Sequence, residues 1–354
     1  MNFARYIKPL FALGLALLLG GCGNLGYYVH LARGEYSMLS RREPISEILK
    51  DPAADPILKA RLTRVLDARA FASQTLHLPD NRSYTLYADV GRPYVVWNVF
   101  AAPELSLEPV QHCFLLIGCL AYRGYFDLAH ARAEADALKT DGDEVFIAGV
   151  PAYSTLGWFD DPVLNTMMRW SDEQLIATVF HELAHQQYYL KGDTAFDESF
   201  ANFVGEEGLR QYLVARGGAS DTEILRRQRE QTFIELVMDT RAQLADIYTS
   251  NLPDAGKRMR KQQAFAHLRE QYAQLRAGPW KNFAGYDAWF AGEMSNAKLL
   301  PFGLYDKWVP AFAELYRLQN SDWPAFYAAV EQLGEEPDEA RTEKLKQLSA
   351  KQER

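Results

Sequence analysis

Cysteines and basic residues are both in short supply in this chain of 354 residues. It has 3 cysteines, so there is room for one intrachain disulfide at most. Lysine and arginine number 38 against 46 acidic residues, which gives a formal net charge of −8. An acidic domain repels polyanions, so we expect no nucleic acid among its partners.

Long apolar runs are almost missing. The only one, residues 10–19, follows Arg5 and Lys8 and has the length of a signal-peptide core. It ends in Leu19-Gly20-Gly21-Cys22, which resembles a bacterial lipobox. We therefore expect residues 1–21 to be a lipoprotein signal peptide and Cys22 to be acylated. The alternatives are an uncleaved anchor and an ordinary secretory signal.

The residue after Cys22 predicts in which of the two bacterial membranes the lipoprotein is anchored. Gly23 follows, not Asp, and in the usual sorting of such lipoproteins this favours the outer membrane, facing the periplasm. The mature chain would have 333 residues, and its net charge would move from −8 to −10, because residues 1–21 carry Arg5 and Lys8 and no acidic residue.

The other two cysteines, Cys113 and Cys119, lie six positions apart. In an oxidising periplasm such a pair can close a short-loop disulfide. Metal ligation by these cysteines is the rival interpretation, but no nearby motif adds further ligands. The disulfide is the favoured interpretation.

A His-Glu-x-x-His motif is present at His181-Glu182-Leu183-Ala184-His185. Two histidines four positions apart on a helix lie on one face, one turn apart, so both rings can bind one ion. The preceding Ser171 is a helix cap, and the apolar spacing from Leu175 onward predicts a partly buried helix that ends before Gly192. Zinc prefers such imidazole ligands, and Glu182 is placed to act as the general base on water.

A catalytic zinc needs a third protein ligand, and Glu198 is the candidate. It lies 13 residues after His185, at the start of a second expected helix whose neighbouring phenylalanines should be buried. A carboxylate among them needs a partner. The alternative is a surface residue in an acidic helix that also contains Glu206 and Glu207. Asn202, one turn further, is a candidate for orienting a ligating histidine.

These segments are similar to the gluzincin arrangement of zinc peptidases, in which a Glu on the helix after the His-Glu-x-x-His helix is the third ligand. Most of residues 20–330 resembles the bacterial family of predicted zinc-dependent aminopeptidase lipoproteins. The resemblance implies a zinc aminopeptidase in which Zn²⁺ is held by His181, His185 and Glu198. Asp197 stands where such families usually carry Asn, which adds a negative charge beside the ligand. Further segments that carry the resemblance are Gly26-Tyr27-Tyr28, Arg69-Ala70-Phe71-Ala72, Tyr94-Val95-Val96-Trp97-Asn98-Val99, Tyr122-Arg123-Gly124-Tyr125, Ala152-Tyr153-Ser154-Thr155-Leu156-Gly157-Trp158-Phe159-Asp160-Asp161-Pro162, Asn296-Ala297 and Val309-Pro310-Ala311-Phe312.

The expected fold class is α+β and zincin-like, with a small mixed sheet carrying the active-site helix and a mainly α-helical C-terminal half. A β-hairpin is predicted from residues 84–88 and 94–99 around a turn at 91–93. Residues 221–250 and 255–276 should form a long helical hairpin, a solvated scaffold or a docking arm. The expected divisions are a signal peptide (1–21), an extended lipidated stalk running into a short helix (22–50), an α/β subdomain (51–192), a helical subdomain (193–335) and a charged tail or frayed helix (336–354).

Peptide hydrolysis also needs a donor to the developing oxyanion, and Tyr153 and Tyr305 are the candidates. Residues 149–159 are the expected edge segment for the substrate backbone, and Asn296 is a candidate substrate contact. The predicted function is a zinc peptidase, an aminopeptidase by resemblance alone, that acts on peptides. A zinc hydrolase of cell-wall or lipid amides and a catalytically silent peptide-binding lipoprotein are the alternatives.

Overall fold

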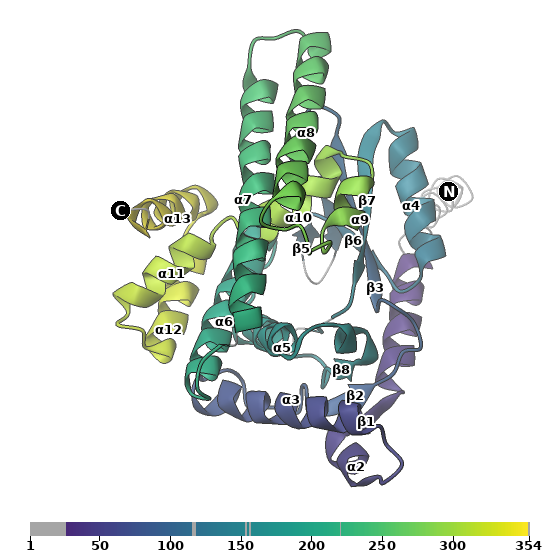
Figure 1. The fold of residues 1–354 in the computed structure, drawn as a ribbon, viewed down its shortest axis with the longest axis vertical. Coiled ribbons are helices and arrows are strands. Elements are labelled where there is room, and N and C mark those ends of the chain that lie inside the picture. Colours follow the sequence, from purple (N-terminus) through teal and green to yellow (C-terminus); the bar gives the residue numbers. More distant parts are fainter. Residues whose placement is uncertain (1–25, 115–117, 153, 156, 220, 353–354) are drawn as a thin grey trace, which may run out of the picture.

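A computed structural model describes residues 26–352 apart from 115–117, 153, 156 and 220, and of residues 303–305 and 352 it describes the backbone alone (Figure 1). The predicted signal peptide (residues 1–21) and Cys22 lie outside the described residues. The described part is a mixed α+β fold in which small sheets precede a helical second half. The strands are β1 (Arg42–Pro44), β2 (Leu86–Ala88), β3 (Val96–Pro103), β4 (His112–Phe114), β5 (Gly118–Leu120), β6 (Arg123–Tyr125), β7 (Asp143–Val150) and β8 (Val163–Leu164).

The helices follow the caps and apolar spacing of the sequence. Asp55, Asp127, Ser171, Asp193, Ser295 and Asp322 each accept a backbone N–H in the first turn of the helix that they precede. The described helices are α2 (Ile45–Lys50), α3 (Pro56–Gln74), α4 (Leu128–Thr140), α5 (Asp172–Gln187), α6 (Thr194–Val214), α7 (Asp221–Thr249), α8 (Asp254–Ala277), α9 (Asp287–Ala291), α10 (Asn296–Tyr305), α11 (Val309–Leu318), α12 (Trp323–Gly334) and α13 (Asp338–Gln352), with a 3₁₀ turn η1 at Asn165–Arg169.

An antiparallel sheet has β3 between β6 and β7. β3 pairs with β7 along its whole length, from Val96 opposite Val150 to Pro103 opposite Asp143. Side chains alternate between the two faces of a strand, and both faces of β3 are buried. Val99 and Ala101 pack toward α4, and Phe100 and Ala102 pack on the side of Leu300 in α10.

The predicted hairpin of residues 84–88 and 94–99 is wrong. β2 pairs antiparallel with β1 and parallel with β8, whereas β3 belongs to the other sheet. Both edges of β2 are occupied by strands from distant parts of the chain, so β3 has no place beside it. The Val90 backbone N–H after β2 donates to the Asn165 side chain, which directs the chain toward η1 and away from a tight turn.

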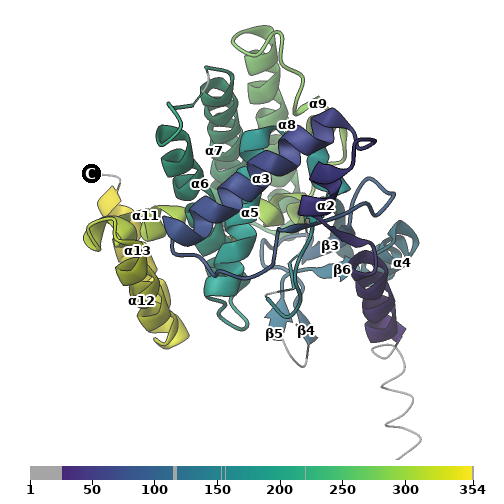
Figure 2. The same cartoon turned by 90° about the horizontal axis from the view of Figure 1, so that it is seen from below.

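Helices α5 and α6 form the centre of the main core, where Val179, Leu183, Phe196 and Phe200 are fully buried. Helix α3 runs across the outside of this pair (Figure 2). The predicted helical hairpin is confirmed: α7 and α8 pack side by side and project from the molecule (Figure 1). A separate core, which includes Phe233 and Tyr272, holds the hairpin against α9 and α10.

Both ends of the described chain differ from expectation. Residues 26–39 are helical, not an extended stalk, and Tyr27 and Met38 are buried. The expected frayed C-terminal end is the regular helix α13, which packs on α11, with Leu345 buried. Arg341 of α13 forms an ion pair with Asp193, the cap of α6, at 3.1 Å. Most residues of this segment are charged, so its composition alone does not indicate the few residues that contact the rest of the protein.

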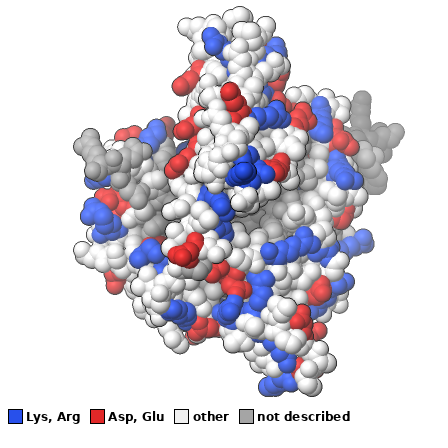
Figure 3. All heavy atoms as spheres, in the orientation of Figure 1, with Lys and Arg blue, Asp and Glu red and all other residues white. Residues whose placement is uncertain are grey.

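Among the described residues, no helix is both long and apolar enough to cross a membrane. Basic and acidic side chains are interspersed over the face shown in Figure 3, including the projecting hairpin.

Candidate metal centre and cleft

Helix α5 presents the motif histidines. Ser171 and Gln174 form a capping box: Gln174 N donates to Ser171 Oγ at 3.2 Å, and Ser171 N donates to Gln174 Oε1 at 3.3 Å. The helix ends at Gln187, earlier than the sequence predicts, because Tyr188 is already extended. This early end lets Leu190 N donate to Asp197 Oδ1 at 2.7 Å, which fastens the connection to α6.

His181, His185 and Glu198 converge. The Nε2 atoms of His181 and His185 lie 3.1 Å apart, and Glu198 Oε2 lies 3.4 Å and 3.6 Å from them. All three ligand atoms lie within 4.8 Å of one another. The three side chains are nearly buried. Glu198 lies on the same helix as the fully buried core residues Phe196 and Phe200. The carboxylate therefore does not lie on an acidic surface helix.

A glycine sets how closely α5 and α6 approach at this point. A Cβ at Gly205 would stand 2.9 Å from the carbonyl oxygen of Ala177 and 3.3 Å from His181 Cβ. Real Cβ atoms do not tolerate the first contact. Only glycine therefore fits here without moving α6. Gly205 is not among the site residues predicted from the sequence, although a glycine inside a helical pattern can be a sign of close packing.

Two imidazole nitrogens and one carboxylate oxygen are the donor set of a gluzincin-type zinc site, so the residues present fit Zn²⁺. His185 Nδ1 and Asp197 Oδ2 are both buried and have no hydrogen-bond partner in the described part of the chain.

The two glutamates have opposite electrostatics. Burial raises the pKa of Glu182 to about 7; the His181 ring opposes the rise, and the Glu198 and Asp161 carboxylates add to it. Burial would also raise the pKa of Glu198, but hydrogen bonds with His181 and His185 and the charge of these rings outweigh it and hold that pKa at about 2. Glu198 is thus an anion suited to binding a cation, and Glu182 is a carboxyl poised near neutral pH, as a general base requires.

A cleft of about 790 Å³ contains His181, Glu182, His185 and Glu198. One wall comes from the helix of residues 26–39 and the strands β3 to β6, with Tyr27, Leu31 and Phe114 among its apolar residues. The opposite wall comes from α5, α6 and α7. Residues 22–50 were predicted to form a stalk, so no part of the cleft was expected from them. Tyr27, Leu31 and Met38 nevertheless have helical spacing in the sequence.

The remaining predicted site residues fare differently. Asn202 lines the cleft, and its Nδ2 donates to Asp306 Oδ1 at 3.4 Å. Burial raises the pKa of Asp306 to about 7, with Glu230 adding to the rise. Tyr153 lies outside the described residues. Tyr305 ends helix α10, and its side chain also lies outside what is described.

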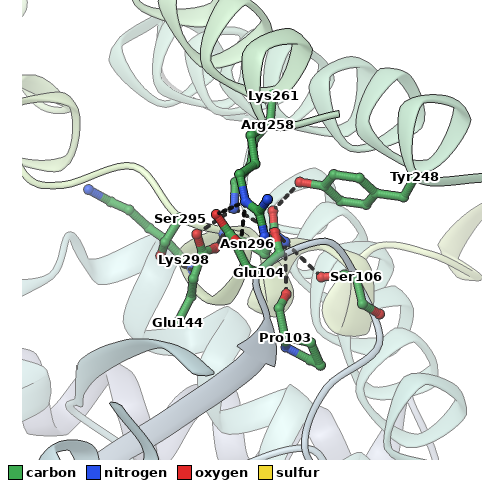
Figure 4. Close-up of polar contacts among 10 residues, drawn as sticks. All are labelled: Pro103, Glu104, Ser106, Glu144, Tyr248, Arg258, Lys261, Ser295, Asn296 and Lys298. Carbon is green, nitrogen blue, oxygen red and sulfur yellow. Dashed lines mark hydrogen bonds and ion pairs between the residues drawn. The ribbon is translucent and has the colours of Figure 1, made fainter. Parts of the chain in front are cut away.

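The proposed substrate contact of Asn296 is wrong, because its side chain is 0 % exposed and lies away from the cleft. Its Nδ2 donates to the carbonyls of Pro103, Glu104 and Ser106 at 3.1, 2.8 and 2.8 Å, and its Oδ1 accepts from Tyr248 Oη at 2.7 Å (Figure 4). Its backbone N–H donates to Glu144, which also pairs with the buried Lys261. Asn296 joins the end of β3 to the α7–α8 hairpin.

Residues 149–159 are only partly an edge segment. β7 is an edge of its sheet and ends at Val150; the chain then leaves the strand and lines the cleft with Ala152, Ser154 and Thr155. Cys113 and Cys119 lie opposite each other in the β4–β5 pair, and their sulfurs are joined in a disulfide. The rival interpretation of these two cysteines as metal ligands has no place in this geometry.

A second group, His30, Asp127 and His130, also brings its ligand atoms within 4.8 Å of one another. His30 Nε2 accepts the Phe126 N–H at 2.9 Å, so the proton of a neutral His30 ring is on Nδ1, facing Asp127. A metal would need that nitrogen free of its proton. We assign this group to hydrogen bonding between the helix of residues 26–39 and α4.

Comparison with protein families places the chain. Residues 26–345 match the family described as "Putative aminopeptidase", and because the match covers most of the chain, the protein belongs to this family. Comparisons with curated proteins and with solved structures give no match.

Proposed function

We propose that this protein is a zinc-dependent peptidase of the gluzincin type, and that His181, His185 and Glu198 hold the metal. The observation that carries the proposal is the convergence of these three nearly buried side chains beside Glu182, inside a cleft large enough for a peptide. Membership of an aminopeptidase family supports peptides as the substrate class.

Bound there, Zn²⁺ would supply Lewis acidity, which lowers the pKa of water and polarises a carbonyl. The chain's own residues supply the remaining steps. Glu182 takes a proton from the attacking water and delivers it to the leaving amine, and a pKa of about 7 suits both tasks at neutral pH. The Glu198 carboxylate stays ionised throughout.

The test is a digest of a peptide library with purified protein, read by mass spectrometry. We expect cleavage that stops when a chelator is added and returns with Zn²⁺. Glu182→Gln keeps the shape of the side chain but cannot accept the proton, so turnover should fall by about 10²–10⁴-fold with zinc retained. Binding without hydrolysis would favour the silent binding protein, and cleavage of muropeptides in place of peptides would favour the cell-wall amide hydrolase.

We also propose that acylation of Cys22 anchors the protein in the outer membrane, facing the periplasm. The lipobox-like sequence before Cys22 supports this. Cys22→Ser should move the protein from the membrane to the soluble periplasmic fraction. Membrane association that survives alkaline washing in this variant would instead identify residues 10–19 as an uncleaved anchor.

A further inference from the structure

The connection between β7 and β8 presents two large aromatic side chains at the cleft. Trp158 is 70 % exposed and Phe159 is 48 % exposed, and both line the same cleft as Glu182 and the metal ligands. By contrast, Trp280, Trp308 and Trp323 are buried. Exposed tryptophan beside a cleft is a usual feature of binding sites, because the ring offers a large contact area with few rotatable bonds.

The described residues of this loop are hydrogen-bonded to the buried carboxylate of Asp161. Asp161 is fully buried, and its carboxylate accepts from Thr155 Oγ1 at 2.8 Å, from Thr155 N at 3.1 Å and from Ser154 Oγ at 3.2 Å. Thr155 in turn closes the turn that carries the rings. Phe159 N donates to Thr155 Oγ1 at 3.1 Å, and Trp158 N donates to the Thr155 carbonyl at 3.1 Å.

The Asp161 carboxylate also connects the loop to α5, the helix that carries His181 and His185. Gln186, the residue after His185, donates through Nε2 to Asp161 Oδ2 at 3.2 Å and to Ser83 Oγ at 3.3 Å. Its Oε1 accepts from Asn81 Nδ2 at 2.8 Å, so the amide is fully used. The described residues of the aromatic loop are therefore hydrogen-bonded, through Asp161 and Gln186, to the helix that carries His181 and His185.

The chemistry of the adjoining wall indicates what the rings contact. Val150, Pro151, Ala152 and Trp170 line the same cleft, and all are uncharged. Asp160, the charged neighbour of Phe159, is paired with Arg82 at 3.5 Å. An apolar side chain would bury surface here without leaving a charge unpaired.

We propose that Trp158 and Phe159 form a specificity subsite that grips a bulky apolar side chain of the peptide beside the scissile bond. The proposal rests on the proposed peptidase function, because it takes the occupant of the cleft to be a peptide. Loss of an aromatic ring that the bound peptide covers weakens binding without removing the catalytic groups. The effect should therefore fall on peptide affinity and KM rather than on kcat.

Binding is measured with the zinc-loaded protein, expressed from the full-length gene, purified in detergent and carrying Glu182→Gln so that peptides stay intact. The probes are two fluorescein-labelled peptides that differ by one residue, Phe or Ala, at the cleavage point that the library digest of the unmutated protein gives, or in the middle of the peptide if there is none. We expect Trp158→Ala to weaken binding of the Phe peptide by about 10- to 100-fold and to abolish the preference over Ala. Phe159→Ala should act in the same direction. Tyr36→Ala, which removes a 74 % exposed ring outside the cleft, should change neither affinity.

Unchanged affinity and preference in Trp158→Ala would overturn the subsite, even if the unmutated protein cleaves peptides. Preferential binding of the Phe peptide without any hydrolysis by the unmutated protein would overturn the proposed function and leave the subsite standing. A failure of every peptide to bind would overturn the subsite. A membrane contact is the competing role for the rings. If brominated phosphatidylcholine in phosphatidylethanolamine–phosphatidylglycerol vesicles quenches the tryptophan fluorescence of the protein and Trp158→Ala removes that quenching, the subsite is also overturned.

Discussion

Gly205 of α6 lies directly against His181 of α5, so close that a Cβ at Gly205 would stand 3.3 Å from His181 Cβ. The proposed third ligand, Glu198, lies two turns earlier on the same helix α6. The separation of the two helices at Gly205 therefore sets how far Glu198 lies from the histidines. A residue with no chemistry of its own controls the size of the metal site.

Gly205→Ala should therefore weaken the metal centre. The new Cβ would meet the Ala177 carbonyl at 2.9 Å, a backbone atom that cannot move aside alone, so α6 must shift. Overpacking of this kind costs about 1–3 kcal/mol of folding stability. We expect a lower unfolding temperature and a weaker zinc affinity, measured by differential scanning calorimetry and by competition with a fluorescent chelator.

Gly256→Ala is the matched control, because Gly256 is also inside a helix but a Cβ there would meet nothing closer than 3.6 Å. Alanine is the better helix former, so this variant should be as stable as the parent or more stable by up to about 1 kcal/mol. Equal zinc affinity in the parent and Gly205→Ala would show that the approach of the helices does not set the metal geometry.

Removal of Glu198 tests the third ligand. Purified protein should contain about one zinc per chain, and Glu198→Ala should lower this occupancy sharply, because two histidines alone bind zinc weakly. Metal content is measured by plasma mass spectrometry after dialysis against a weak chelator. Full retention of zinc in Glu198→Ala would exclude this carboxylate as a ligand.

Asn202→Ala separates support from ligation. Asn202 donates to Asp306 and lines the cleft, so its loss should lower zinc occupancy less than loss of Glu198 does. Glu207→Ala is the control on the same helix, since Glu207 pairs with Arg210 at 2.6 Å away from the ligands. A drop in zinc content for Glu207→Ala as large as that for Glu198→Ala would indicate general damage to α6.

The convergence of His181, His185 and Glu198 was predictable because its signals are local. The spacing of His181 and His185, the cap at Ser171 and the phenylalanines around Glu198 each depend on residues within one or two turns. The polar support was not predictable in the same way. Asp161 contacts Gln186, and Gln186 contacts Asn81, across separations that no periodicity describes.

The fold shows the same division between local and distant information. Alternation located β2 and β3 but could not identify their partners, because β2 pairs with β1 and β8 from distant parts of the chain. The charged composition of residues 336–354 predicted a tail or frayed helix, whereas α13 is a regular helix in which a few residues such as Leu345 and Arg341 make the contacts. The helix of residues 26–39 has a local signal too, the helical spacing of Tyr27, Leu31 and Met38, but its position directly after Cys22 favoured the prediction of an extended stalk.

Asn296→Ala should loosen the projecting hairpin without touching the cleft. The substitution leaves buried carbonyls and the Tyr248 hydroxyl without their partner, which costs about 2–4 kcal/mol. Hydrogen exchange should accelerate around Tyr248 in the second half of α7 and in α8. The cleft-lining residues Arg226 and Glu230 are in the first half of α7, so peptide affinity per folded molecule should stay the same. Asn251→Ala, in the exposed turn between these helices, is the control and should be nearly neutral. Faster exchange around α5 alone would contradict a clamp on the hairpin.

Asp161 should make stability depend on pH. Burial raises its pKa from the ordinary 3.8 to about 6, against hydrogen bonds from Thr155, Ser154 and Gln186 that lower it. The folded state therefore holds this proton more tightly than the unfolded chain does. The resulting stabilisation is complete below pH 4 and is lost as the pH rises through about 6.

Asp161→Asn isolates this contribution, because the amide does not titrate. The variant loses hydrogen-bond acceptors at every pH, which gives a constant offset, whereas the carboxyl contribution changes with pH. We therefore expect the unfolding free energy of the parent to fall relative to that of the variant by about 2 kcal/mol between pH 4 and pH 7. Urea unfolding at half-unit pH steps measures both proteins in the same buffers, so metal release and histidine titration, which the two share, cancel in the difference. A difference that stays constant over this range would mean that Asp161 ionises equally well in the folded and unfolded chains, and its burial beneath the aromatic loop would then have no electrostatic cost.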